Sequence, residues 1–159
     1  MNPWVLNGSP LILFARIDSL DIVDRLAKPI MVPDAVIDEV RAGEADEPFT
    51  PVALAFAQPR RVPNVPLSAR VASWDLGLGE SQVIAQAIQN AAWKVLDALA
   101  ARRCATTHQV PVVGSMGIIL RAKRNGLVES AGLWIAKLRG AGMYVDDGLV
   151  HNELASIGE

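Results

Sequence analysis

The chain is poor in cysteine, histidine and aromatic residues, and these shortages exclude several kinds of protein. Cys104 is the only cysteine among 159 residues, so no internal disulfide can form, and we expect a reducing, cytoplasmic location. One cysteine and two distant histidines give no ligand spacing for zinc. No apolar run is long enough to cross a bilayer and the first residues do not read as a signal peptide, so we expect neither membrane insertion nor export.

An excess of positive charge is also absent, because 15 lysines and arginines face 17 aspartates and glutamates, for a net charge of −2. Any contact with nucleic acid must therefore come from local basic clusters. Each cluster, taken alone, fits a solvated helix face equally well. The candidates are Arg60-Arg61, Arg102-Arg103 and the group of Arg121, Lys123 and Arg124.

What the chain does have is a globular composition, 51% hydrophobic, in which short apolar runs alternate with helical patterns. We expect one domain over residues 1–159, with an irregular proline-rich insertion at about 43–67 that holds one helix at 50–57. Strands alternating with helices predict an α/β fold with a central parallel sheet of four to five strands. The predicted strands are 4–7, 29–32, 93–96 and 110–113, with 144–145 as a possible fifth, edge strand. The predicted helices, beside 50–57, are 10–16 capped by Ser9, 20–27 capped by Ser19, one capped by Asp34, one turn or two at 69–74, 79–90, 98–105, 115–125, 130–139 and 147–156.

Four polar positions stand where such a sheet delivers its functional groups. Asn7 and Asp97 each end an apolar run, while Glu39 and Glu80 lie on helices. The carboxyl ends of parallel strands, and the helices that follow them, meet at one edge of a sheet. If the four positions converge there, they form an oxygen-rich pocket for a hard divalent cation, which can activate water against a phosphodiester.

Each position also has a structural explanation. Asn7 precedes Gly-Ser-Pro, so it fits a turn residue. Glu39 fits a solvated helix residue, and its neighbour Asp38 competes for the same role. Glu80 follows Gly77-Leu78-Gly79 and would gain from the helix dipole, and Asp97 would serve as an N-cap. Only the convergence of the four side chains in space would favour the functional interpretation over the structural one.

Five segments in order resemble the PIN-domain family, and within it a prokaryotic branch of short PIN-like predicted nucleases. The resemblance covers almost the whole chain and is weakest at 43–67. It implies a three-layer α/β/α fold, Mg²⁺- or Mn²⁺-dependent cleavage of RNA and, for many bacterial members, a dimeric toxin of a type II toxin–antitoxin pair. The segments are N-G-S-P-L-I-L-F-A-R-I-D-S-L-D-I-V, V-P-D-A-V-I-D-E-V, L-G-L-G-E-S-Q-V-I-A-Q-A, V-L-D-A-L-A-A-R-R-C-A and V-P-V-V-G-S-M-G-I-I-L-R-A-K-R-N-G-L-V.

The resemblance places the family's four acidic positions, in order, on Asn7, Glu39, Glu80 and Asp97. We expect Glu80 and Asp97 to bind the metal directly, Glu39 to hold a metal-bound water or a second ion, and Asn7 to orient that water or contribute its carbonyl oxygen. Ser9 matches the small polar residue that accompanies the first acid and is expected near a phosphate. Arg102 or Arg103 would reach the RNA backbone. Gly114 and Ser115 match the turn after the fourth strand.

Two departures from the family pattern weaken the hold on a cation. Asn7 replaces a carboxylate by an amide, and Ala98 stands where relatives commonly carry a second acid beside Asp97. The alternative to a nuclease is therefore a catalytically degenerate PIN-like module that binds nucleic acid or protein.

Other sites fit the residues less well. Ser115 follows a strand and opens a helix as a nucleophile does, but Val113 occupies the place of the glycine that this turn requires. The glycines at 77 and 79 lack the third glycine of a dinucleotide loop. Trp134, with Leu133, Ile135 and Leu138, predicts a helix that packs on a partner subunit.

Overall fold

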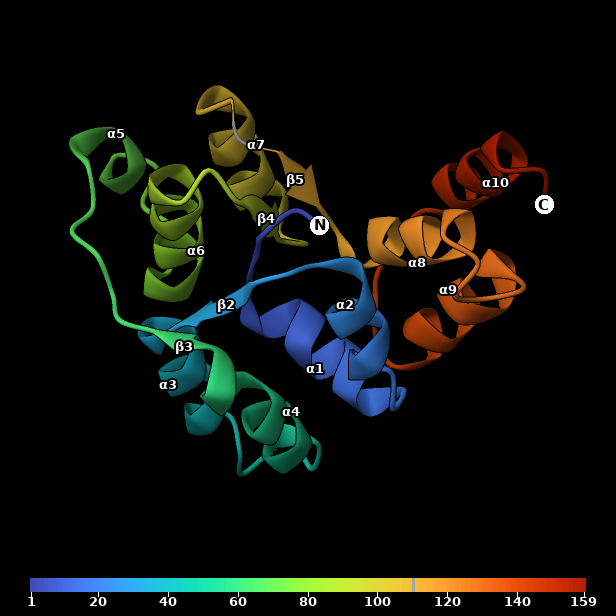
Figure 1. Ribbon diagram of the computed structural model, residues 1–159, viewed down its shortest axis with the longest axis horizontal. Helices are drawn as coiled ribbons and strands as arrows, with labels where there is room; N and C mark the ends of the chain where they lie inside the picture. The colour runs from blue at the N-terminus through green and yellow to red at the C-terminus, as the bar shows by residue number, and fades with distance from the viewer. Residues whose placement is uncertain (110) are drawn as a thin grey trace.

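The structure is a computed structural model that describes residues 1–109 and 111–159. Five parallel strands form one sheet in the order β3-β2-β1-β4-β5 (Figure 1). The predicted α/β class and its parallel sheet are confirmed. The strand predicted at 110–113 is observed only over Val112–Val113, because Pro111 precedes the strand and residue 110 lies outside the described residues. The strands are β1 Trp4–Leu6, β2 Ile30–Pro33, β3 Arg61–Val62, β4 Trp93–Val95 and β5 Val112–Val113.

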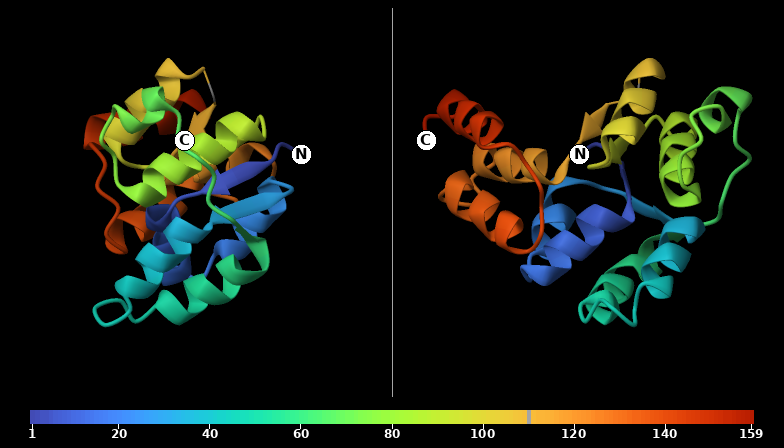
Figure 2. Two further views of the ribbon diagram at one scale, coloured as in Figure 1. Left: turned by 90° about the vertical axis from the view of Figure 1, so that its left-hand side faces the viewer. Right: turned by 180° about the vertical axis from the view of Figure 1, so that it is seen from behind.

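Helices cover both faces of the sheet and complete three layers. Figure 1 shows α5, α6 and α7 on one side and α1, α2 and α4 on the other, and the turned views of Figure 2 agree. Among the described residues, no helix combines the length and the apolar character that crossing a membrane requires. The helices are α1 Gly8–Arg16, α2 Leu20–Leu26, α3 Asp34–Ala42, α4 Thr50–Ala57, the 3-10 helix η1 Gln58–Arg60, α5 Ala69–Ala72, α6 Leu78–Gln89, α7 Leu99–Thr107, α8 Ser115–Arg124, α9 Ala131–Gly140 and α10 Asp147–Ser156.

Parallel pairing brings the ends of three strands to one edge. The backbone N–H of Asn7, just after β1, donates to Val95 O of β4 at 3.1 Å. The N–H of Leu96, just after β4, donates to Val113 O of β5 at 3.1 Å. The residues that follow β1, β4 and β5 therefore lie side by side. Buried apolar side chains from the strands and from both helical layers form the core beneath this edge, among them Leu6, Phe14, Ile84, Leu96 and Ile118.

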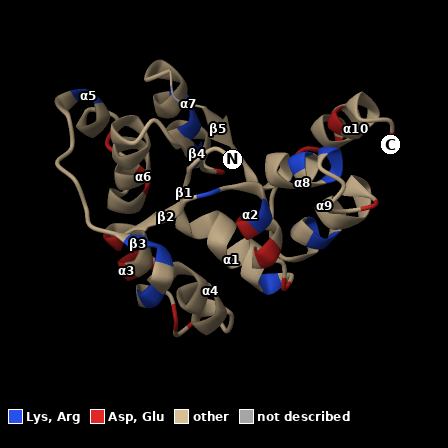
Figure 3. Cartoon of the chain, viewed as in Figure 1, with Lys and Arg blue, Asp and Glu red and all other residues tan. Residues whose placement is uncertain are grey.

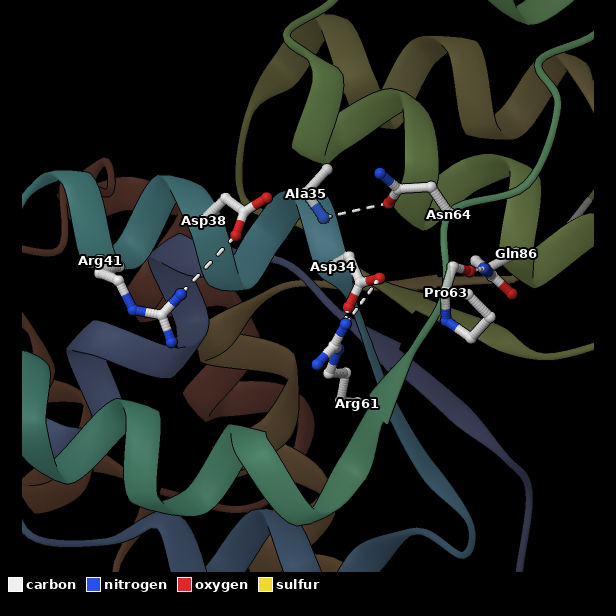
Figure 4. A network of polar contacts seen from close by, with 8 residues as sticks. All are labelled: Asp34, Ala35, Asp38, Arg41, Arg61, Pro63, Asn64 and Gln86. Carbon is white, nitrogen blue, oxygen red and sulfur yellow. Dashed lines mark hydrogen bonds and ion pairs between the residues drawn. The ribbon is translucent and has the colours of Figure 1, made fainter.

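The proline-rich stretch contributes the edge strand β3, which the sequence did not predict. Groups from α3 and α6 hold this stretch by hydrogen bonds and an ion pair (Figure 4). Its prolines have no backbone N–H with which to form such bonds themselves. Arg61 pairs with Asp34, Asn64 Oδ1 accepts from Ala35 N at 3.0 Å, and Gln86 Nε2 donates to Pro63 O at 2.5 Å. These tertiary contacts, which have no local sequence signature, fix the segment.

The edge strand predicted at 144–145 is wrong, because the backbone there is used by the neighbouring helices. Met143 N donates to Leu138 O at 2.9 Å at the end of α9, and Arg139 Nη2 donates to Val145 O at 2.9 Å. Asp146 Oδ2 accepts from Leu149 N at 3.0 Å and caps α10. The segment is thereby fixed without joining the sheet.

Two predicted caps were also assigned to the wrong residue. Helix α1 begins at Gly8 with Asn7, not Ser9, in the N-cap position, and α3 begins at Asp34 with Pro33 before it. Ser19 does precede α2, but its hydroxyl donates to Ile17 O at 2.9 Å and does not cap the helix.

The side chain of Glu159 ties the end of the chain to the start of α9. Its carboxylate accepts from Ala131 N and Gly132 N, both at 2.9 Å, and from Ser130 Oγ at 3.2 Å. Lys123 Nζ of α8 lies 3.1 Å away. These hydrogen bonds, above all those of the two backbone N–H groups, lower the pKa of Glu159 from 4.5 to about 2.

We expect Glu159→Gln to lower the melting temperature at pH 7. A carboxylate with a depressed pKa in the folded state stabilises the fold above its unfolded value of 4.5 and loses that contribution as the pH falls to about 2. The variant should therefore also lose less stability than the wild type over this range, as measured by thermal denaturation at several pH values. Glu44→Gln, at an exposed glutamate that forms no salt bridge with a described residue, is the control. Equal melting temperatures at pH 7 would contradict the anchoring role.

Candidate active site

A cleft of about 1180 Å³ opens at the carboxyl edge of the sheet. The structure brings all four of the predicted polar positions to its wall, from four separate segments of the chain. Helix α3 supplies one, the start of α6 another, and the segments after β1 and β4 the other two. The residues from the predicted site that line the cleft are Asn7, Ser9, Glu39, Glu80, Asp97 and Arg102.

Asp97 is the most firmly positioned of the four. Its Oδ1 accepts from Ser115 N at 2.7 Å, and its Oδ2 accepts from Ser115 Oγ at 2.7 Å. Ser9 Oγ donates to the same Oδ2 at 3.3 Å. Asp97 is not the N-cap of α7, since Ala98 takes that position. The structural alternative for Asp97 is thus wrong, and its carboxylate is instead oriented by serines from α1 and α8.

Glu39 reaches the cleft because Gly79, the second residue of α6, leaves room for its carboxylate where the two helices meet. Gly79 N donates to Glu39 Oε1 at 2.9 Å. A Cβ on Gly79 would lie 2.4 Å from Glu39 Oε2, which is far inside contact distance. Any other residue at this position would force the carboxylate to move. Both Glu39 and its neighbour Asp38 are exposed, but Asp38 pairs with Arg41 at 3.7 Å and does not line the cleft.

Glu80 lies in the first turn of α6, next to Glu39. Burial, and then the negative charge of Glu39, raise the pKa of the Glu80 carboxyl above its ordinary value. Neither glutamate forms a salt bridge with a described residue, nor does Asp97. The cleft therefore holds three carboxylates without a paired cation, two of them close enough to repel each other.

Asn7 has the backbone of a turn residue, but its side chain does not serve the turn. It occupies the N-cap position of α1, where asparagine commonly bonds to the helix, yet makes no capping hydrogen bond. It is 7% exposed, and its amide bonds to no residue that the structure describes. The amide is available to a ligand in the cleft.

The two arginines predicted to contact nucleic acid have different positions. Arg102 lines the cleft. A Cβ at position 114 would lie 3.0 Å from Arg102 Nη1 and close to Asp97, so Gly114 leaves room for both side chains. Arg103 is exposed and does not line the cleft. The structure thus brings one of the pair together with the acidic positions.

Arg121 and Arg124 line the same cleft and were not assigned to the site from the sequence. Their spacing of three residues places both on one face of α8, a signal that the sequence does contain. Lys123, between them, bonds instead to Glu159 and Glu129. Ser115 was matched only to a turn, although its two hydrogen bonds orient Asp97.

The side-chain oxygens of Asn7, Ser9, Glu39, Glu80 and Asp97 are suitable ligands for a hard divalent cation, because they are carboxylate, amide and hydroxyl oxygens. Within the described residues, however, no three side chains of aspartate, glutamate, histidine or cysteine gather closely enough to enclose a metal ion. Mg²⁺ keeps several waters and needs only one or two direct carboxylates, so an open arrangement of this kind is compatible with it.

A serine-histidine triad does not form among the described residues. The Ser115 hydroxyl is buried and donates to Asp97, not to a histidine. His108 lies against Cys104 O at 2.8 Å on α7.

Comparison with known proteins agrees with the fold. A family model described as PIN domain matches residues 3–159, so the chain belongs to the PIN-domain family. No curated protein matches the chain. The PIN domain is a nuclease-type fold, and PIN domains generally depend on divalent metal ions.

We expect Gly79→Ala to lower the pKa of Glu80 without destabilising the fold. The added Cβ displaces the Glu39 carboxylate, which is the mobile end of a side chain, and so removes the charge that opposes ionisation of Glu80. Alanine also favours a helix over glycine by up to about 1 kcal/mol. Carboxyl ¹³C NMR titration measures the pKa, and thermal denaturation measures the stability. Gly140→Ala, with open space around its Cβ, is the control. An unchanged Glu80 pKa would contradict the Glu39–Glu80 coupling.

Proposed function

We propose that the protein is a metal-dependent endoribonuclease of PIN type. The observation that supports this most is the set of three carboxylates without salt-bridge partners, Glu39, Glu80 and Asp97, on one cleft wall with the unbonded amide of Asn7. Carboxylates that lie together repel one another unless a proton or a cation joins them. The proposal treats residues 1–159 as one PIN-like domain, with 43–67 as its insertion.

In this proposal Glu80 and Asp97 hold Mg²⁺ or Mn²⁺, while Glu39 and Asn7 orient the water that attacks the phosphodiester. When bound, the ion would lower the pKa of that water and offset the charge of the phosphate. The hydrogen bonds from Ser115 and Ser9 fix the Asp97 carboxylate, so little reorganisation is needed when substrate arrives. Arg102, beside Asp97, is placed to contact the RNA backbone.

The finer biological role follows the family resemblance. We propose that the protein is the toxin of a type II toxin–antitoxin pair, acts in the cytoplasm, and binds an antitoxin protein. A homodimer is part of the proposal, although Ile135 and Leu138 of the predicted contact helix pack in the chain's own core. Leu133, which is 68% exposed, and the partly buried Trp134 are left to meet a partner.

A catalytically degenerate PIN-like module is the second candidate, favoured by three observations. The first acidic position is an amide, Ala98 adds no carboxylate at the start of α7, and the described carboxylates do not enclose an ion. Such a module would bind nucleic acid or a protein through the same cleft without cutting.

The nuclease proposal predicts that Asp97→Asn abolishes Mn²⁺-dependent cleavage of single-stranded RNA. We expect a loss of more than about 100-fold, since removing even a supporting partner of a metal ligand typically costs about 10- to 100-fold. Asparagine keeps the size of the side chain and one oxygen for Ser115 N, so the melting temperature should change little. Cleavage of a fluorescent RNA measures activity, and Asp38→Asn on the exposed face of α3 is the control. Wild-type protein that neither binds Mn²⁺ nor cuts RNA would refute the proposal.

Asn7→Asp distinguishes the two candidates. An added carboxylate beside the other three should tighten Mn²⁺ binding about tenfold or more, because each unit charge within a few ångströms of the ion is worth on the order of 1 kcal/mol or more. Isothermal titration calorimetry measures the affinity, and Asn152→Asp on exposed α10 matches the change in charge. Activity that appears only in Asn7→Asp would identify the wild type as degenerate. Equal Mn²⁺ affinity would show that Asn7 does not face the ion.

A further inference from the structure

The end of the cleft away from α3 and α6 is lined by basic and apolar side chains. Helix α8 contributes Arg121 and Arg124, and the segment between α9 and α10 contributes Met143 and Tyr144. Leu149 of α10 lies in the same wall. Figure 3 shows the lysines and arginines that gather on α8, close to α9 and α10. This end therefore has a different chemistry from the acidic end.

Tyr144 is 99% exposed, the highest value among the large hydrophobic side chains. Its backbone is nevertheless held on both sides. Met143 N bonds to Leu138 O at 2.9 Å, and Val145 O accepts from Arg139 Nη2 at 2.9 Å. The cap formed by Asp146 begins α10 directly afterwards. A ring that is fully exposed on a fixed backbone at the wall of a cleft is prepared for a planar ligand at little conformational cost.

The arginines of this end form no salt bridge with the described carboxylates. Arg121 lies over the Trp93 ring at 4.3 Å, and Arg124 is exposed. Arg16 and Arg139 nearby do pair, with Glu47 and Asp147. Two carboxylates, Asp146 and Glu153, also line this end, and Asp146 already accepts from Leu149 N as the cap of α10, so the positive charge of this end lies on the α8 side. Arginines without a carboxylate partner, beside an exposed aromatic ring, suit a ligand that has both phosphates and bases.

We infer that Tyr144 is a stacking platform for one base of a single-stranded RNA, and that Arg121 and Arg124 bind its phosphates. The inference rests on the proposed function, because it takes the acidic end as the place of cleavage on the same strand. A base in a duplex is already stacked on its neighbours, whereas an unpaired base can turn onto the ring. The site would thus select single strands without reading their sequence.

The chain has one tyrosine, so 3-fluorotyrosine gives one ¹⁹F resonance that reports on Tyr144 alone. We expect this resonance to shift when a single-stranded hexanucleotide RNA is added in EDTA, where cleavage cannot occur. An abasic strand with the same number of phosphates, or a duplex, should shift it much less. An equal shift with the abasic strand would overturn the inference, because phosphate contact alone would then explain it. A shift that depends on protein concentration without RNA would also overturn it, by showing that a second copy covers Tyr144.

Affinity supplies the second readout. Stacking on an aromatic side chain predicts that Tyr144→Ala binds the hexanucleotide about 5- to 100-fold more weakly, while Tyr144→Phe stays within about threefold of the wild type. Ile88→Ala, at an exposed apolar residue of α6 outside the cleft, is the matched control. Wild-type affinity in Tyr144→Ala would overturn the inference.

The two proposals fail separately. RNA that stacks on Tyr144 but is never cut with Mn²⁺ would refute only the nuclease activity. If the wild type cuts RNA, but RNA does not shift the ¹⁹F resonance of Tyr144 and Tyr144→Ala binds RNA with wild-type affinity, only the stacking site is refuted.

Discussion

The parallel pairing of β1, β4 and β5 is the constraint on which the candidate site depends. It fixes the order in which the chain passes the carboxyl edge of the sheet, and so sets Asn7, Asp97 and Ser115 beside one another. The hydrogen bonds from Ser115 to Asp97 then join the segments after β4 and β5. Helices α3 and α6 add Glu39 and Glu80 from the side, through the close approach at Gly79. Loss of the Ser115–Asp97 bonds or of the Gly79–Glu39 contact would move a carboxylate and leave the sheet intact.

The site is also where the fold departs from the arrangement that stability alone would favour. Several carboxylates elsewhere are matched, as Asp34 is with Arg61 and Glu159 is with Lys123 and the start of α9. In the cleft, Glu39 and the partly buried Glu80 lie together without a paired cation, and burial, followed by the charge of Glu39, raises the pKa of Glu80. Unbalanced charge of this kind is typical of functional sites, because a ligand can supply the balance that the protein withholds. The amide at Asn7 carries one negative charge fewer than a carboxylate would and so reduces that imbalance.

The cleft has two chemically distinct ends, and this gives a direction to any strand that crosses it. The acidic end has a rigid carboxylate and an unbonded amide, while the other end has unpaired arginines and an exposed ring on a fixed backbone. The phosphates of a long anion match the basic end directly, whereas the acidic end would accept them only with a bound cation. The net charge of −2 conceals this, because the basic residues that matter are concentrated on one helix.

The sequence by itself determined the order of strands and helices, since apolar periodicity and turn residues are local signals. It also named the four polar positions, because strand ends and helix starts can be recognised from neighbouring residues. Only the tertiary structure decided that these positions line one cleft, that Arg102 and not Arg103 lies there, and that Arg121, Arg124 and Tyr144 complete it. It likewise decided that Arg61–Val62 forms the edge strand and 144–145 does not, since long-range hydrogen bonds fix both segments. Contacts between residues far apart in the chain leave no periodic trace in a single sequence, and they are what turns separate residues into a site.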